Sequence, residues 1–196
     1  NDHINNVELK ERPFKLQGTS EYTCDALIIA TGASAMYLGL PSEKEYLGKG
    51  VSACATCDGF FYKDQEVAVI GGGNTSMDCC RTAIRLGAED VKVTVRSPFE
   101  EMKASDWEIE EAIDEGIPIL ENTSPKEFVV DDNGKLKGVK FEKVAPQYSD
   151  DGKRKMVPTG EEIVIECDDV LLAIGQDNAF DWIERDIGME FGEWDM

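Results

Sequence analysis

Two cysteines separated by two residues are the first feature of this sequence whose spacing can do chemistry. Cys54 and Cys57 enclose Ala-Thr, and Asp58 follows directly. Thiols at this spacing can close a small disulfide ring and accept two electrons, and an adjacent carboxylic acid can protonate a leaving thiolate. A zinc site would need two further ligands, and the spacing of the other cysteines does not supply them. The pattern favours redox chemistry, with an idle pair of thiols as the alternative.

A run of three glycines is the second chemical feature. Gly71, Gly73 and Ser76 match a dinucleotide-binding fingerprint with Ser at the third glycine position. The first glycine permits a tight turn, the second lets the backbone approach a diphosphate, and the third position needs only a small residue. Asn74 and Thr75 lie at the start of the expected helix, whose free N–H groups and dipole favour phosphate. The alternative is a purely structural glycine turn.

The residues after the next expected strand bear on the choice between NAD and NADP. An acidic residue at this place binds the ribose 2′-hydroxyl of NAD, whereas an arginine receives the 2′-phosphate of NADP. Arg96 and Ser97 stand here, which favours NADP over NAD. Glu100 and Glu101 follow closely, and they either oppose the phosphate or face water.

The elements that position these residues form a strand–turn–helix–strand unit. The pattern predicts strands over residues 66–70 and 91–95 and, between them, a helix that runs from the glycine turn to about Leu86 and stops at Gly87. Further parallel strands are predicted over 117–120 and 169–174. The last of these ends in Gly175, near which we expect the nicotinamide to lie.

The remaining patterns complete an α/β fold. Short strands in meanders are predicted at residues 7–9, 14–16, 22–24, 128–130, 138–144 and 163–167. The fold class is therefore a Rossmann-like NAD(P)-binding domain, with a parallel sheet plus an antiparallel meander. We interpret the similar segments ALIIATG (26–32) and VLLAIG (170–175) as the points where the chain leaves and re-enters a host domain. The alternative is two unrelated buried strands.

Four local expectations are open to direct comparison with the structure. Residues 26–30 are predicted to form a strand buried on both faces, because they are continuously apolar. Residues 41–50 are predicted to be a linker, and residues 146–155 a polar loop. A helix is predicted over 106–115, and its candidate core contacts are Trp107, Ile109, Ala112 and Ile113.

Composition excludes several classes of function. The net charge is −20, and residues 99–196 carry 27 acidic against 10 basic side chains, which disfavours nucleic acid and anionic membranes as partners. The sole histidine, His3, leaves no Ser-His-Asp triad or histidine-based zinc site. No apolar run is long enough to span a membrane, and the first twenty residues do not form a signal peptide. These features favour a cytoplasmic protein, and no metal is expected.

The residues that surround the cysteine pair carry a family resemblance. VSACATCDGFFY (51–62) followed by VAVIGGGNT (67–75) resembles low-molecular-weight thioredoxin reductase, and the similarity covers about residues 4–75. The resemblance implies that Cys54 and Cys57 form the redox-active disulfide and that Asp58 is the general acid. It implies electron transfer from NADPH through FAD to the disulfide and then to a thioredoxin-like partner. It also makes a homo-oligomer possible.

The later part of the chain resembles a second group in the pyridine nucleotide-disulfide oxidoreductase superfamily. SMDCCRTAIRLGAEDVKVTVRS (76–97) and DDVLLAIGQ (168–176) look like the glutamate synthase small subunit and related NADPH:flavin reductases. That resemblance implies an iron–sulfur or flavin partner subunit as the electron acceptor. A non-catalytic dinucleotide-binding module is a further alternative.

Both groups insert an NAD(P) domain into an FAD domain. The resemblance therefore implies an NAD(P)-binding domain over 46–169 and partial FAD-domain segments over 1–45 and 170–196. The N-terminal GxGxxG and the C-terminal Gly-Asp segment that hold FAD in both groups are absent from this sequence. We therefore expect FAD to be bound in a complete chain, and not securely by these residues alone.

Overall fold

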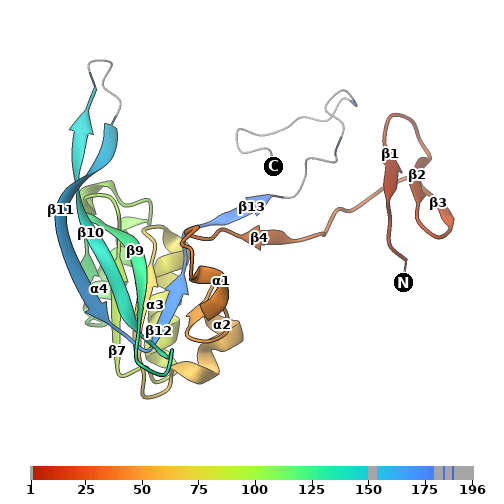
Figure 1. Ribbon diagram of the computed structural model, residues 1–196. Coiled ribbons are helices and arrows are strands. Elements are labelled where there is room, and N and C mark those ends of the chain that lie inside the picture. The colour runs from red at the N-terminus through yellow and green to blue at the C-terminus, as the bar shows by residue number, and fades with distance from the viewer. Residues whose placement is uncertain (1, 150–153, 179–182, 184–186, 188–196) are drawn as a thin grey trace. The chain divides into compact units, whose positions relative to one another are not determined.

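The computed structural model describes residues 2–149, 154–178, 183 and 187 (Figure 1). The chain divides into two compact units, residues 35–175 and residues 1–34 with 176–196. Every predicted site residue belongs to the larger unit. Among the described residues, no helix is both long enough and apolar enough to cross a membrane.

A five-stranded parallel sheet is the centre of the larger unit. Its strands lie in the order β5 (Val51–Ser52), β12 (Asp169–Leu172), β6 (Glu66–Ile70), β7 (Asp90–Thr94) and β8 (Ile119–Leu120). All four neighbouring pairs are parallel. Parallel strands bring their carboxyl ends to one edge, so the loops that follow β6, β7 and β12 gather there. The predicted α/β fold with a parallel sheet is confirmed.

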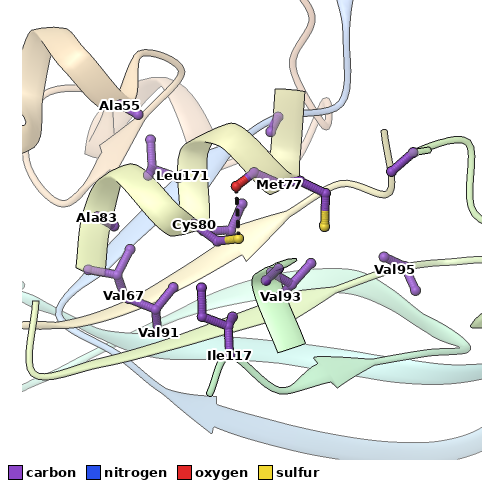
Figure 2. Close-up of a cluster of buried hydrophobic side chains, with 14 of the residues drawn as sticks. Ala55, Val67, Met77, Cys80, Ala83, Val91, Val93, Val95, Ile117 and Leu171 are labelled. Carbon is purple, nitrogen blue, oxygen red and sulfur yellow. Dashed lines mark hydrogen bonds between the residues drawn. The ribbon is translucent and has the colours of Figure 1, made fainter. Parts of the chain in front are cut away.

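Two helices cover one face of this sheet. Val67 and Val69 of β6 are fully buried on that face, as is Leu171 of β12. They pack with Met77 and Cys80 of α3 (Asn74–Arg85), as Figure 2 shows, and with buried residues of α4 (Asp106–Asp114). The predicted helix after the glycine turn is confirmed.

A long antiparallel sheet covers the other face. It consists of β9 (Thr123–Val130), β10 (Leu136–Tyr148) and β11 (Arg154–Glu166) in the order β11-β10-β9. Ala68 and Ile70, which alternate with the helix-facing valines of β6, pack with Val139 and Phe141 of β10. This alternation explains why residues 67–70 of β6 are apolar throughout, since they are buried on both sides of the sheet.

Four short helices complete the described part of the larger unit, and three of them lie at or near the Cys54–Cys57 segment in the sequence. They are α1 (Glu43–Tyr46), α2 (Ala55–Asp58) and two 3-10 helices, η1 (Gly59–Tyr62) and η2 (Phe99–Glu101). The prediction of a linker over 41–50 is wrong for residues 43–46, which form α1. The buried Glu43 carboxylate accepts hydrogen bonds from the backbone N–H groups of Leu38 and Gly39, both at 2.8 Å, and this ties the segment down.

The smaller unit contains two small sheets. The first is antiparallel and joins β1 (Asn6–Glu8), β2 (Phe14–Gln17) and β3 (Glu21–Cys24), which confirms the predicted meander. The second pairs β4 (Ala33–Ala35), whose last residue is counted with the larger unit, with β13 (Gln176–Asn178).

The prediction of a buried strand over 26–30 is wrong. No strand is formed there, and Ile28 is 90% exposed. A strand buried on two faces needs hydrogen-bonding neighbours and covering side chains, and the described residues of this unit provide neither.

Two further expectations are corrected in the larger unit. Trp107 and Ile113 are 58% and 48% exposed, so only Ile109 and Ala112 of that set reach the core from α4. The loop predicted over 146–155 is replaced at its two ends by strand, because β10 continues to Tyr148 and β11 begins at Arg154. Residues 150–153 lie outside the described part of the chain.

The inner strand β12 should contribute strongly to stability, because its residues 170–172 are buried. We expect Leu171→Ala to lower the free energy of unfolding by about 2–5 kcal/mol, since it removes apolar contacts and leaves a cavity. Urea denaturation measures the change. The matched control is Leu86→Ala at an exposed leucine, which should cost less than about 1 kcal/mol. Equal losses in the two variants would contradict this description of the core.

A carboxylic acid at the start of β12 should make stability depend on pH. Burial raises the pKa of the Asp169 carboxyl from 3.8 to about 6, and the neighbouring Asp168 adds to the rise. The folded chain therefore holds this proton more tightly than the unfolded chain, so stability falls as the pH rises from about 4 to 6. Asp169→Asn should stabilise the fold by about 1–2 kcal/mol at pH 7.5, a value reduced for solvent screening. Little change is expected at pH 4, and urea midpoints at the two pH values measure the difference.

Candidate active site

The two cysteines of the CATC segment form a disulfide at the start of α2. Cys54 caps the helix, and its Sγ accepts a hydrogen bond from the Cys57 N–H at 3.2 Å. Cys57 is exposed, whereas Cys54 and Asp58 are half-buried. The pair is therefore closed within one turn of chain, with one of its two cysteines open to solvent.

The disulfide turn is anchored to the parallel sheet by Ser52. This buried residue of β5 uses its hydroxyl oxygen to accept a hydrogen bond from the Cys54 N–H at 3.0 Å. β5 is itself paired with β12. Reduction of the disulfide would free the two sulfurs, but it would leave this backbone anchor in place.

The four other cysteines lie outside the disulfide. Cys80 and Cys167 are buried, and burial raises the pKa of each thiol to about 12. Burial also raises the pKa of the Cys79 thiol, and Cys79 and Cys24 are both half-buried. Among the described residues, no group of three or more His, Cys, Asp and Glu side chains is placed to hold a metal ion.

The glycine turn follows β6 at the carboxyl edge of the sheet. Gly71 has a φ of +152°, and a Cβ there would lie 2.2 Å from the Ala173 carbonyl oxygen. By contrast, a Cβ on Gly73 would point into open space. No side chain caps α3 at its N-terminus. The Ser76 N–H donates to the Gly73 carbonyl at 2.9 Å, which leaves the N–H groups of Asn74 and Thr75 for a ligand.

A cavity of about 990 Å³ opens over this turn at the carboxyl edge. Six of the predicted cofactor-binding residues line it: Gly71, Gly73, Thr75, Arg96, Ser97 and Gly175. The other two have structural contacts. Asn74 Oδ1 accepts a hydrogen bond from the Ser105 N–H at 2.9 Å, and the buried Ser76 hydroxyl donates to the Gly73 carbonyl at 2.6 Å.

Cationic residues that were not predicted from the sequence also line this cavity. Lys103 follows η2, while Arg154 and Lys155 begin β11 on the antiparallel sheet. Arg154 forms an ion pair with Glu101, another lining residue. The sequence feature that could have indicated Arg154 and Lys155 is the basic run at 153–155, which stands within a strongly acidic half of the chain.

The disulfide and the cavity are separate features of the larger unit. Cys54, Cys57 and Asp58 are not among the residues that line the cavity. The structure therefore brings most of the predicted cofactor-binding residues together, but does not bring the disulfide to them.

The whole chain, residues 1–196, matches the family model described as pyridine nucleotide-disulphide oxidoreductase. The chain belongs to this family. It is 49% identical over 141 residues to thioredoxin reductase of Escherichia coli O157:H7, which is 71% of this chain and 44% of that protein. It is 41% identical over 178 residues to thioredoxin reductase of Coxiella burnetii, covering 90% of this chain and 51% of that protein.

A solved structure agrees with these relatives. The crystal structure of thioredoxin reductase from T. acidophilum superposes with a TM-score of 0.78 at 27% identity, covering 98% of this chain and 58% of that one. The predicted membership of the superfamily and the resemblance to thioredoxin reductase are confirmed, and the similarity extends well beyond residue 75. The resemblance of the later part to glutamate synthase remains a prediction. The chain spans about half the length of these curated relatives.

Thiol counting tests the disulfide directly. Without reductant, the denatured chain should react at four thiols, because Cys54 and Cys57 are closed and the other four cysteines are free. Complete reduction should raise the count to six. Cys57→Ser should give five thiols under both conditions, since Cys54 then has no partner. A count of six in the unreduced wild-type chain would contradict the pairing.

Proposed function

We propose that this chain is the NAD(P)H-binding part of a flavin-dependent oxidoreductase that reduces the Cys54–Cys57 disulfide. One observation carries the proposal. A closed CxxC disulfide and an open, uncapped glycine turn belong to the same compact unit. Membership of the pyridine nucleotide-disulphide oxidoreductase family supports the pairing of these two features.

The residues of the cavity fit a dinucleotide at its diphosphate. The open space beside Gly73 admits a phosphate where a side chain would block it, and the uncapped α3 N-terminus offers N–H donors and a positive dipole. Gly71 and Gly175 would bound the nicotinamide side. Arg96 and Ser97 would face the adenosine ribose, an arrangement that favours NADPH over NADH.

The chain's own chemistry at the disulfide is a two-electron reduction. The S–S bond breaks, and two electrons and two protons yield the Cys54 and Cys57 thiols. Asp58 follows Cys57 directly, and we assign it the role of proton donor to the departing sulfur. The Cys57 N–H, which donates to Cys54 Sγ at 3.2 Å, would stabilise negative charge on that sulfur.

The flavin belongs to the complete protein in this proposal. FAD, when bound there, would carry the electron pair from the nicotinamide to the disulfide. Residues 1–45 and 170–196 would be FAD-domain segments that flank an NAD(P)-binding domain over 46–169. The exposed Ile28 supports this assignment, because an apolar segment of this kind requires covering residues from elsewhere.

The partner in this proposal is a thioredoxin-like protein whose disulfide exchanges with the reduced cysteines. The names of the relatives support this substrate class. The four free cysteines support a reducing compartment, which we propose is the cytoplasm. The complete protein is proposed to form a homo-oligomer, as the family resemblance implies.

Nucleotide titration by calorimetry tests the proposed function. The wild-type chain should bind NADPH more tightly than NADH. Gly73→Val should weaken NADPH binding at least about tenfold, because its side chain would fill the space for the diphosphate. The free energy of unfolding should change by less than about 1 kcal/mol, since Gly73 has an ordinary φ of −107° and no atom lies within 4 Å of the added Cβ. Unchanged affinity in this variant, or no binding by the wild type, would sink the proposal.

A further inference from the structure

The cavity receives positive charge from two different sheets. Arg96 follows β7 of the parallel sheet, where the sequence pattern places a single arginine followed by Ser97. Arg154 and Lys155 begin β11 and line the same cavity from the antiparallel sheet. The long β10–β11 hairpin thus adds cations that the dinucleotide fingerprint does not include.

One lining residue has the wrong charge for a phosphate. Glu101 stands at the end of η2 and lines the cavity, where its carboxylate would repel a phosphomonoester. Arg154 forms an ion pair with this carboxylate. The Arg154 and Glu101 side chains are 30% and 40% exposed, so the pair is partly shielded from water.

We infer that Arg154 is a specificity-determining residue, whose guanidinium supplies the second cation for the 2′-phosphate of NADPH while it neutralises Glu101. This inference rests on the proposed function, since it concerns the adenosine end of the same nucleotide. An arginine binds a phosphate through two parallel N–H···O bonds, which Ser97 cannot replace. Without Arg154, the free Glu101 carboxylate would repel a 2′-phosphate and could accept a hydrogen bond from a 2′-hydroxyl.

The effect should therefore depend on the 2′ substituent. Arg154→Gln should weaken binding of NADPH about 10- to 100-fold, the range expected when a charge-assisted contact is lost. NADH binding should stay within about threefold of the wild type, because NADH has no phosphate at that position. Glu101→Gln should strengthen NADPH binding a few-fold, since it removes the opposing charge.

The experiment is calorimetric titration of the 196-residue chain with NADPH, NADH, adenosine 2′,5′-bisphosphate and AMP. The last two probes isolate the adenosine end and need no flavin. Lys126→Gln is the matched control, because Lys126 lies on the same antiparallel sheet and forms an ion pair with Glu162, but does not line the cavity. It should change none of the four affinities by more than about twofold. Urea denaturation of each variant checks that folding is intact.

The outcomes separate this inference from the proposed function. A selective loss of NADPH and of the bisphosphate in Arg154→Gln supports it. Equal weakening of all four probes would mean that Arg154 attracts nucleotides only through its general charge, and it would overturn the inference. Unchanged affinities would also overturn it. In both cases the proposed function would stand. If the wild-type chain binds no probe at all, the proposed function and the inference both fail.

Discussion

The close passage of two backbones at the carboxyl edge of the parallel sheet determines the geometry of the candidate site. Gly71 turns the chain out of β6 where the Ala173 carbonyl follows β12, and a Cβ would lie 2.2 Å from that oxygen. There is no room for a side chain at this contact. The φ of +152° at Gly71 also lies in a region that residues with side chains rarely adopt. The turn therefore leaves β6 tightly enough for α3 to begin three residues later, with its first N–H groups uncapped at the cavity.

The layers on the two faces of the parallel sheet each contribute to the cavity. On one face, Met77 and Cys80 pack α3 into the hydrophobic core. This packing holds the N-terminus of α3 in place at the cavity. On the other face, strand β11 of the antiparallel sheet begins at Arg154, which lines the cavity. The nucleotide site that we propose is thus assembled from both layers, whereas the disulfide is fixed by Ser52 of the edge strand β5.

Local pattern was sufficient where the physical cause of structure is local. The β6–turn–α3–β7 unit followed from apolar runs, the glycine turn and the stop at Gly87, whose φ is +96°. Prediction failed where the cause lies in distant or absent contacts. The apolar residues 26–30 lack covering neighbours among the described residues, and Trp107 projects from the exposed side of α4. Arg154 was assigned to a loop, since no local signal shows that a hairpin end meets η2.

The central claim is that the backbone amides at the start of α3 bind the diphosphate of a pyridine nucleotide. Nuclear magnetic resonance of the ¹⁵N-labelled chain during addition of NADPH observes these amides individually. The account predicts that the largest chemical-shift changes occur at the N–H groups of Gly72, Gly73, Asn74 and Thr75, with smaller changes at Arg96. The largest changes at residues away from this turn, or none at a saturating nucleotide concentration, would contradict it.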